Sequence, residues 1–572
     1  MKAVVAGLIA VCVATVAGLL LGFAGGLDAL RAAVALGLGG LAGGAAWRSL
    51  SGLPKGESPR GWAAWGVITV FALFALRAFC WQLFTREGDL YFLSPNNLGD
   101  LSLHLTYIQW LAHAPFLPAN PIFASQPLHY PFGVDLWNAL LLLAGADVQR
   151  GLVWTGLLGA LATAVALWRW GGAFTLAGFL FNGGIAGFAF LTTLHLEDYQ
   201  RELDWKSIPL ALFVTQRGLL YALPAGLALL WSWRERLLEG RRGLPFWIEW
   251  LLYATMPLFH LHTFLFLSAL LGCWFFLPAT EGIPSPRRAI LRLGLCALLP
   301  ASALVWLLTG GGHSGGMIHL TGGWMQAKDG VLNCAVDNFG ALPLAVVALL
   351  AWMWRRRNTP GTRALAAVVL PSLVFFGITC FVAFAVWAWD NTKLMLWAYL
   401  AILPALWAML CEQKLWLRAV ACVLLFFSGA VSLLGGLGGS GYSLARLPEL
   451  DALKAALAPL PATATVACLP TYNHPLLLLG HKVVAGYDGH LYSHGIPYQA
   501  RYAALESVLR GAPGWETRAY MLGANYLFWG RLEREKYGTA SPWNTPATAG
   551  FPLVAEGPWG YLYALTPLIP PR

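Results

Sequence analysis

The side chains of this chain that are best suited to chemistry lie at the ends of apolar segments. Asp100 and His104 are four residues apart, so on a helix they share one face. A carboxylate at such a place can take a proton from an incoming hydroxyl group, or bind a divalent metal such as Mg²⁺ or Mn²⁺ that does so. The alternative is that Asp100 caps the N-terminus of an apolar helix, and the two roles are compatible. Asp100 and His104 are therefore the predicted catalytic residues.

A second group of side chains is suited to holding a phosphate. Arg217 lies about two turns inside an apolar segment, and the planar fork of arginine fits phosphate, although snorkelling to the interface is the alternative. His260-Leu261-His262 suits a turn that binds a metal, a phosphate or a carboxylate, or is an ordinary interfacial pair. Lys393 follows Asp390 by three residues between two apolar runs, where a charge is costly unless it is paired. The predicted phosphate-binding residues are Arg217, Lys393, His260 and His262.

Polar and aromatic neighbours of these residues are predicted to contact substrate. A glycine-broken loop, Gly486 to His490, could close over the site, although Asp-Gly is also an ordinary turn signal. Tryptophan stacks on sugars but also belts membrane interfaces, and most of the 28 tryptophans fit the belt. The predicted substrate contacts are Gln216, Tyr130, Trp389, Asp390, Asn391, Tyr487 and His490.

The segments that carry these residues are those of a polytopic α-helical membrane protein. The chain is 58% hydrophobic and 11% charged, whereas a soluble domain has about 25% charged residues. Runs of about 20 apolar residues predict transmembrane helices. Thirteen spans are predicted, at 3–25, 28–46, 61–84, 152–168, 172–194, 207–231, 245–259, 262–279, 289–309, 339–354, 364–387, 394–411 and 417–438.

Basic residues gather in short loops, which is the positive-inside pattern and argues against nucleic acid as the reason for the net charge of +10. Placing these loops in the cytoplasm puts the N-terminus inside. The segments at 85–151, 195–206 and 310–338, the turns near His260 and Asp390, and the tail from about 440 then lie outside. The predicted site residues consequently meet on the outer side of the membrane.

Three regions follow from this pattern. Residues 1–60 form two N-terminal spans, residues 61–440 form the transmembrane core with a long first external loop at 85–151, and residues 441–572 form a small extracytoplasmic α/β domain. In that last region, strands are predicted at 464–469, 482–487, 525–529 and 560–565 and a helix at 498–509. Cys334 and Cys468 are the two cysteines outside the spans, and a disulfide between them is one prediction for an oxidising compartment.

The chain resembles the GT-C class of integral membrane glycosyltransferases. The resemblance spans about residues 85–530, in the layout and in an ordered set of motifs: Gly99-Asp100, Gln216-Arg217, His260-x-His262, Trp389-Asp390-Asn391-x-Lys393 and Gly486-Tyr487-x-Gly489-His490. Tyr130-Pro131 also matches an element of the first loop. Many members have two adjacent acidic residues in that loop, whereas Asp100 has no acidic neighbour here.

The resemblance implies transfer of a sugar from a polyprenyl-phosphate donor to a glycan, lipid or protein acceptor, on the outer face of a bacterial cytoplasmic membrane. It implies that Asp100 acts as base or metal ligand near the acceptor, and that Arg217 or Lys393 holds the donor phosphate. Three alternatives remain open: a transporter or flippase of lipid-linked glycans, a non-catalytic scaffold of the cell envelope, and a different enzyme that uses lipid-linked donors, such as a ligase.

Overall fold

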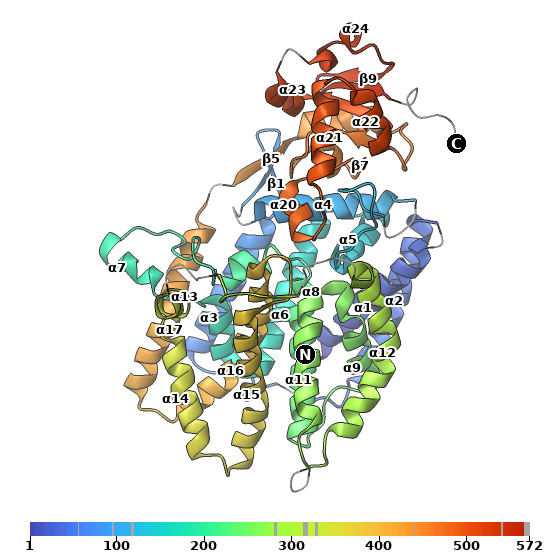
Figure 1. Cartoon of the computed structure of the whole chain (residues 1–572). Coiled ribbons are helices and arrows are strands. Elements are labelled where there is room, and N and C mark those ends of the chain that lie inside the picture. Colours follow the sequence, from blue (N-terminus) through green and yellow to red (C-terminus); the bar gives the residue numbers. More distant parts are fainter. Residues whose placement is uncertain are drawn as a thin grey trace.

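The computed structural model describes residues 1–23, 25–54, 56–93, 97–115, 119–279, 283–312, 318–325, 330–439, 441–538 and 541–565. It is mostly helical: a bundle of long helices lies below a smaller region that contains a β-sheet (Figure 1).

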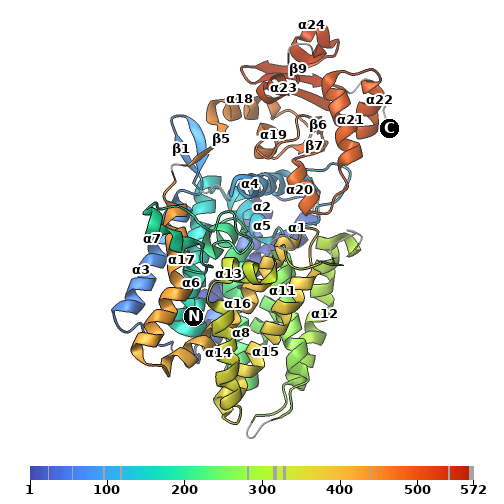
Figure 2. The same cartoon turned by 60° about the vertical axis from the view of Figure 1, so that its left-hand side comes forward.

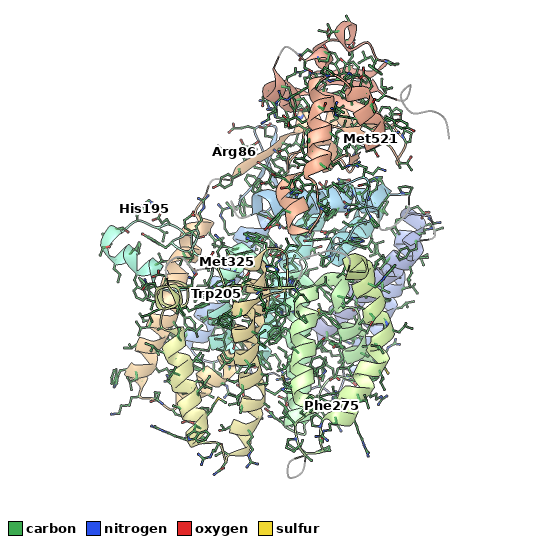
Figure 3. All side chains as sticks on the ribbon, viewed as in Figure 1. Arg86, His195, Trp205, Phe275, Met325 and Met521 are labelled. Carbon is green, nitrogen blue, oxygen red and sulfur yellow. The ribbon has the colours of Figure 1, made fainter. Side chains whose placement is uncertain are left out.

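Eight helices in the described part of the chain are long and apolar enough to cross a membrane, and a ninth span is formed if the bent pair α13–α14 is counted as one. Carbon-rich side chains project from the outer faces of these helices (Figure 3), as expected for surfaces that face lipid. The chain is therefore a multi-pass helical membrane protein. The eight helices are α1 (Lys2–Phe23), α2 (Ala29–Ser49), α3 (Trp62–Cys80), α6 (Val148–Leu180), α12 (Arg287–Thr309), α15 (Pro360–Phe381), α16 (Thr392–Cys411) and α17 (Leu415–Leu437).

The predicted count of thirteen spans is not confirmed, because several predicted spans are broken or short. The α6 helix contains non-helical backbone at Gly171 and Gly172, which lies between the two spans predicted there. Non-α turns flank α8, and the α9–α11 segment is interrupted at His260, whose φ of −162° is extended. These shorter pieces are η3 (Ile208–Phe213), α8 (Leu219–Trp233), η4 (Arg234–Leu238), α9 (Phe246–Ala254), α10 (Met256–Phe259), α11 (Leu261–Phe275), α13 (Val331–Phe339) and α14 (Leu342–Arg355).

The α16 helix is the centre of the bundle. Of its apolar window, 78% is buried inside the protein, against 17–50% for the other seven long helices. Its central position follows from contacts on several sides: Trp397 donates to Thr263 of α11, and Trp170 of α6 donates to the carbonyl of Leu400. The N-terminal end of α16 is therefore held firmly, and this is the end that carries Lys393.

The C-terminal region contains a five-stranded sheet of order β7-β6-β8-β10-β9, with β7, β6 and β8 parallel and β8, β10 and β9 antiparallel. Four strands lie where they were predicted, and the partly exposed edge strand β9 was missed. The strands are β6 (Thr465–Ala467), β7 (Lys482–Val483), β8 (Tyr526–Gly530), β9 (Leu553–Gly557) and β10 (Gly560–Ala564). The helices around them are α18 (Leu447–Leu457), α21 (Gln499–Arg510), α22 (Trp515–Leu522) and α23 (Arg531–Tyr537).

A buried ion pair fastens the sheet to α23. Glu533 accepts hydrogen bonds from His474 at 2.9 Å, from the Leu469 amide at 2.8 Å and from the Gly530 amide at 2.9 Å. These donors hold the pKa of Glu533 below its usual value, although burial alone would raise it. Cys468 is buried beside this pair, and both Cys468 and Cys334 are free thiols, so the predicted disulfide is not formed.

The sheet region is joined to the segment between α3 and α6 by backbone hydrogen bonds. Strands β1 (Phe84–Arg86) and β2 (Asp89–Phe92) form a sheet with β5 (Tyr442–Arg446). Arg86, the last residue of β1, is labelled in Figure 3. The amide of Val483 donates to Pro121 at 2.9 Å, and the amide of Gly486 donates to Ile122 at 2.7 Å.

These links place α20 (Asp488–Ser493) between the sheet region and the upper ends of the bundle helices, next to α4 (Leu98–His113) (Figures 1 and 2). The α4 helix and α5 (Gly133–Leu143) both lie between α3 and α6 in the sequence, in the segment that was predicted to be the first external loop. The remaining elements are η2 (Ala186–Ala189), α7 (Phe190–Thr193), η5 (Gly310–Gly312), β3 (His319–Leu320), β4 (Val382–Ala383), η6 (Ala388–Asn391), α19 (Pro475–Leu478), η7 (Pro542–Asn544) and α24 (Pro546–Ala549).

Candidate functional site

A cavity of about 450 Å³ lies where the segment between α3 and α6, α20 and the upper ends of the bundle helices meet. It brings together segments that are up to several hundred residues apart in the sequence. Ten of the predicted site residues line it: Asp100, Tyr130, Gln216, His260, His262, Trp389, Asp390, Lys393, Tyr487 and His490. His104, Arg217 and Asn391 are not part of this lining.

Asp100 lies in the first turn of α4 and faces the cavity. The residue that precedes the helix is Asn97, so the alternative in which Asp100 itself caps α4 is wrong. Gln216 donates a long hydrogen bond, at 3.5 Å, to the Asp100 carboxylate. Burial raises the pKa of Asp100, and the nearby charges of His104 and Lys393 oppose that shift. A carboxyl with a raised pKa binds a proton more readily than an ordinary aspartate, as a general base requires.

Lys393 and Asp390 form an ion pair of 3.1 Å at the start of α16. The pairing that was the alternative for these two residues therefore exists, and both side chains also line the cavity. Asn391 lies between them in sequence but points into the protein. Its side chain accepts from the amide of Phe384 and donates to the carbonyls of Thr379 and Val382. Asn391 thus positions the loop that carries Trp389 and Asp390, and its predicted contact with substrate is not supported.

Three imidazoles line the cavity with a nitrogen that has no hydrogen-bond partner within the described part of the chain: Nε2 of His260, His262 and His490. The Nδ1 of His260 is already used, because it accepts from the amide of Thr263 at 3.1 Å. Buried polar atoms are rarely left without a partner in folded proteins, so three of them around one cavity indicate a polar occupant, either water or a ligand.

Two glycines allow these histidines to approach: Gly99 of the first predicted motif, and Gly218, which directly follows the Gln216-Arg217 motif. A Cβ at Gly218 would lie 2.3 Å from the carbonyl oxygen of Phe259, which immediately precedes His260. A Cβ at Gly99 would lie 3.3 Å from Nε2 of His490. Burial lowers the pKa of His490 to about 4, so this imidazole is neutral at pH 7 and acts as a hydrogen-bonding group rather than a cation.

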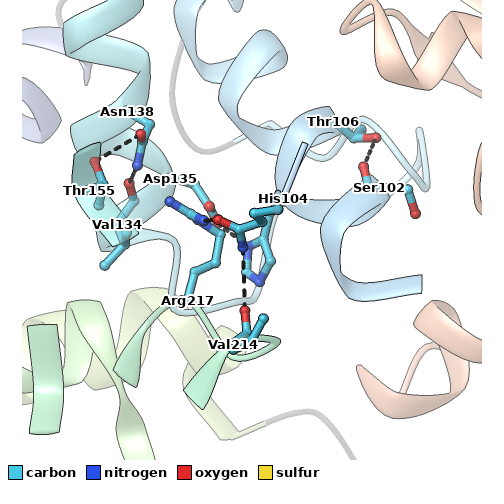
Figure 4. A network of polar contacts seen from close by, with 10 residues as sticks. Ser102, His104, Thr106, Val134, Asp135, Asn138, Thr155, Val214 and Arg217 are labelled. Atoms are coloured by element: carbon cyan, nitrogen blue, oxygen red, sulfur yellow. Dashed lines mark hydrogen bonds and ion pairs between the residues drawn. The ribbon is translucent and has the colours of Figure 1, made fainter. Parts of the chain in front are cut away.

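A second, buried layer of polar residues lies behind the cavity (Figure 4). Nδ1 of His104 is 3.0 Å from each carboxylate oxygen of Asp135, and both side chains are 2% exposed. Arg217 is 1% exposed, donates to Gln82 at 3.0 Å and lies beside Asp135 (Figure 4). Arg217 therefore serves this buried layer, and the geometry does not support its predicted direct contact with a donor phosphate. His104 likewise lies behind Asp100 and does not face the cavity.

Asp135 is the residue of this layer that was not predicted. It is the single carboxylate of α5 (Gly133–Leu143), whose other residues are apolar except for Asn138. An ionisable residue in such a segment is costly without a partner. The presence of one carboxylate among apolar residues is therefore the sequence feature that could have identified Asp135 as a site residue.

Aromatic rings form one wall of the cavity. The ring of Tyr130 lies 4.9 Å from that of His494 and 5.4 Å from that of Tyr107. Trp387 and Trp389 lie 5.1 Å apart, and Trp389 is fixed by its donation to the carbonyl of Asp204. Trp387 is 44% exposed and lines the cavity, so its ring is available to stack on the apolar face of a sugar.

A metal site is not evident in this arrangement. Across the described ranges, no group of three or more His, Cys, Asp or Glu side chains is placed to hold a metal ion. The residues of the cavity thus do not offer the carboxylate-rich oxygen ligand set that Mg²⁺ prefers, and the steps considered below use side chains alone.

Comparison with known proteins gives no family assignment. No protein-family model matches the chain, and no curated protein matches it. The function is therefore argued from the cavity and its residues.

Proposed function

We propose that this protein is a membrane glycosyltransferase of the GT-C type, which transfers a sugar from a polyprenyl-phosphate donor to an acceptor on the outer face of the cytoplasmic membrane. The observation that carries the proposal is the joint placement of Asp100 and Lys393 on one cavity. The first is a carboxyl with a raised pKa, and the second is a lysine at the start of α16, the most buried of the eight long apolar helices.

The chemistry assigns complementary roles to these two side chains. The acceptor hydroxyl attacks the anomeric carbon of the donor sugar and gives its proton to the Asp100 carboxylate. A new bond forms between the acceptor oxygen and the anomeric carbon, while the bond from that carbon to the phosphate oxygen breaks. The bonding electrons leave with the polyprenyl phosphate, whose added negative charge is stabilised by Lys393. Attack opposite to the leaving group inverts the anomeric centre.

The neutral imidazoles and the aromatic wall have supporting roles in this proposal. The free Nε2 atoms of His260, His262 and His490 can hydrogen-bond the phosphate oxygens or sugar hydroxyls. The ring of Trp387 supplies a stacking surface for the sugar. The ion pair with Asp390 weakens the attraction of Lys393 for a phosphate, because the Asp390 carboxylate partly compensates the positive charge of the lysine.

Apolar surfaces near the upper part of the bundle support access from lipid. Leu191 and Leu194 at the end of α7 are 62% and 76% exposed, and Val331 and Leu332 of α13 are 89% and 76% exposed. The α13 helix is bent by 91° from α14, as expected for a segment that lies along the membrane surface. A lipid-linked donor held in this surface would present its phosphate near the level of the cavity.

The flippase and scaffold alternatives make different demands on the cavity. A flippase moves an intact lipid-linked sugar and needs no general base, and a scaffold needs neither. The raised pKa of Asp100 and the unpartnered imidazoles favour the transferase, because groups of this kind are costly to keep unless they are used.

The test is transfer from a panel of polyprenyl-phosphate sugars by the purified full-length protein in liposomes, with release of polyprenyl phosphate as the readout. We expect release that requires an acceptor and is lost in Asp100→Asn. The matched control is Asp488→Asn. Asp488 directly follows the cavity residue Tyr487, but its own carboxylate is exposed and does not line the cavity. Movement of the intact donor across the bilayer, unaffected by Asp100→Asn, would support the flippase instead.

A further inference from the structure

A second cavity, of about 690 Å³, lies at the other end of the bundle and is independent of the proposed catalytic cavity. It is bounded by the loop that joins α2 to α3, the break in α6, the end of α8 with η4, and the C-terminal half of α16. Trp407 lines it and follows Lys393 by fourteen residues on α16, which is roughly 21 Å along a helix at 1.5 Å per residue. We name it the arginine pocket, after its lining residues Arg169, Arg234, Arg241 and Arg242.

The side chains of the arginine pocket carry an excess of positive charge. Its charged lining consists of those four arginines and two carboxylates, Glu57 and Glu235. Glu235 is buried and lies 3.2 Å from Arg241 and 3.9 Å from Arg234. Arg234 and Arg241 also contact Glu239, which is outside the lining. The two carboxylates therefore hold part of the arginine charge in place but do not cancel it.

Two of the guanidinium groups are also held by tryptophan rings. The guanidinium carbon of Arg169 lies 4.5 Å from the ring centre of Trp231, and that of Arg234 lies 4.8 Å from the ring centre of Trp170. Trp168 fixes the facing loop by donating to the backbone carbonyl of Glu57 at 2.8 Å. Ordinary positive-inside residues extend into solvent, whereas Arg169 and Arg234 are half-buried and pre-positioned on the wall of a cavity.

We infer that the arginine pocket binds a phosphate group, supplied either by an anionic lipid headgroup or by a soluble phosphate compound. Arginine presents a planar fork that binds phosphate oxygens in pairs, and forks held in place by aromatic rings lose little freedom on binding. The volume is suited to a headgroup or a pyrophosphate. The two carboxylates disfavour a long polyanion, since each would lie against further negative charge.

Binding by the purified full-length protein tests this inference, with two probes that separate the sources. One probe is short-chain phosphatidylglycerol, compared with diacylglycerol, which lacks the phosphate. The other is inorganic pyrophosphate. The variant is Arg169→Gln with Arg242→Gln, which leaves the ion pairs of Glu235 in place. The control is Arg355→Gln with Arg357→Gln, which removes the same charge outside the pocket. Arg357 is a matched choice because its guanidinium group also lies over a tryptophan ring, 4.7 Å from the ring centre of Trp354.

We expect the pocket variant to lose at least about tenfold in affinity for the probe that binds, and the control to stay within about twofold of wild type. Binding of phosphatidylglycerol alone assigns the site to a lipid headgroup, and binding of pyrophosphate alone assigns it to a soluble phosphate. Failure of wild type to bind either probe would overturn the inference, as would equal losses in the pocket and control variants. Arg242→Gln alone, which changes an exposed side chain, repeats the test if the double variant does not fold.

Discussion

Replacement of Asp100 by asparagine separates function from stability, because the two are expected to change in opposite directions. Asparagine keeps the shape of the side chain and removes its charge and basicity. Under the proposed mechanism it leaves the attacking hydroxyl without a base, and loss of a positioned base lowers a rate by about 10²–10⁴-fold, or about 2.7–5.4 kcal/mol of transition-state stabilisation. Release of polyprenyl phosphate in liposomes is the assay.

The pH dependence of wild-type activity reports the same group. The reacting form of Asp100 is the carboxylate, so activity falls as the pH is lowered through its pKa. Burial holds that pKa above the usual 3.8 of an aspartate, so the acid limb lies at higher pH than for an exposed aspartate. Asp100→Glu is expected to keep an acid limb, whereas the residual activity of Asp100→Asn is expected to have none from this group.

Stability is expected to move in the opposite direction. An acid whose pKa is raised by folding destabilises the folded state at neutral pH, because the charged form is disfavoured by burial. Asp100→Asn should therefore melt at the same temperature as wild type or higher, and Asp488→Asn should leave both activity and melting unchanged. A variant with full activity, or one that loses activity only because it unfolds, would refute the role assigned to Asp100.

Three further predictions follow from the same contacts. Lys393→Gln should weaken donor binding by about tenfold or more and lower the release rate, measured as KM and kcat for the donor, because the leaving phosphate loses its cation; an unchanged donor response would remove Lys393 from the site. His104→Asn and Asp135→Asn should each slow turnover, and the double variant should be no slower than the slower single variant. The reason is that the two side chains act together through the 3.0 Å contact between Nδ1 of His104 and the Asp135 carboxylate. Fully additive losses in a double-mutant cycle would contradict this coupling. Glu533→Gln should destabilise the C-terminal sheet region by about 3 kcal/mol, measured by thermal unfolding. Because folding lowers the pKa of Glu533, its stabilising effect is present above the usual 4.5 and is lost as the pH falls through the lower folded value; a wild-type protein whose unfolding is indifferent to pH in that range would count against it.

The sequence allowed the prediction that the site residues lie on one side of the bundle, because this depends only on which ends of the apolar segments share a side. The positive-inside pattern fixes which ends of the apolar segments share a side, and that placed Asp100, His260 and Lys393 together before any contact was known. The strands β6, β8 and β10 were also predictable, since each is a short apolar run bounded by turn residues.

Orientation within a segment could not be predicted in the same way. Arg217 follows the irregular turn of η3, so a helical count from the segment end does not give the direction of its side chain. Asn391 lies between two cavity residues, yet its side chain bonds to the backbone of 379–384. The pairing of His104 with Asp135 depends on the packing of α4 on α5, which no local pattern records.

The number of spans was the least predictable feature. Gly171 and Gly172 interrupt α6, and extended backbone at His260 interrupts the helices on either side of it. Hydropathy windows register the apolar composition of such segments but not the breaks within them, because irregular backbone is tolerated in an apolar segment where it is buried in protein.

Under the proposed function, Asp100 takes part in attaching a sugar to a component of the cell envelope. The decisive measurement is mass spectrometry of envelope glycans, lipids and glycoproteins, in a strain that carries Asp100→Asn against one that carries the wild-type chain at matched expression. We expect the loss of one defined sugar from one class of product in the Asp100→Asn strain and no change in an Asp488→Asn strain. An identical glycan profile in the Asp100→Asn strain, with the protein folded and present at the wild-type level, would contradict it.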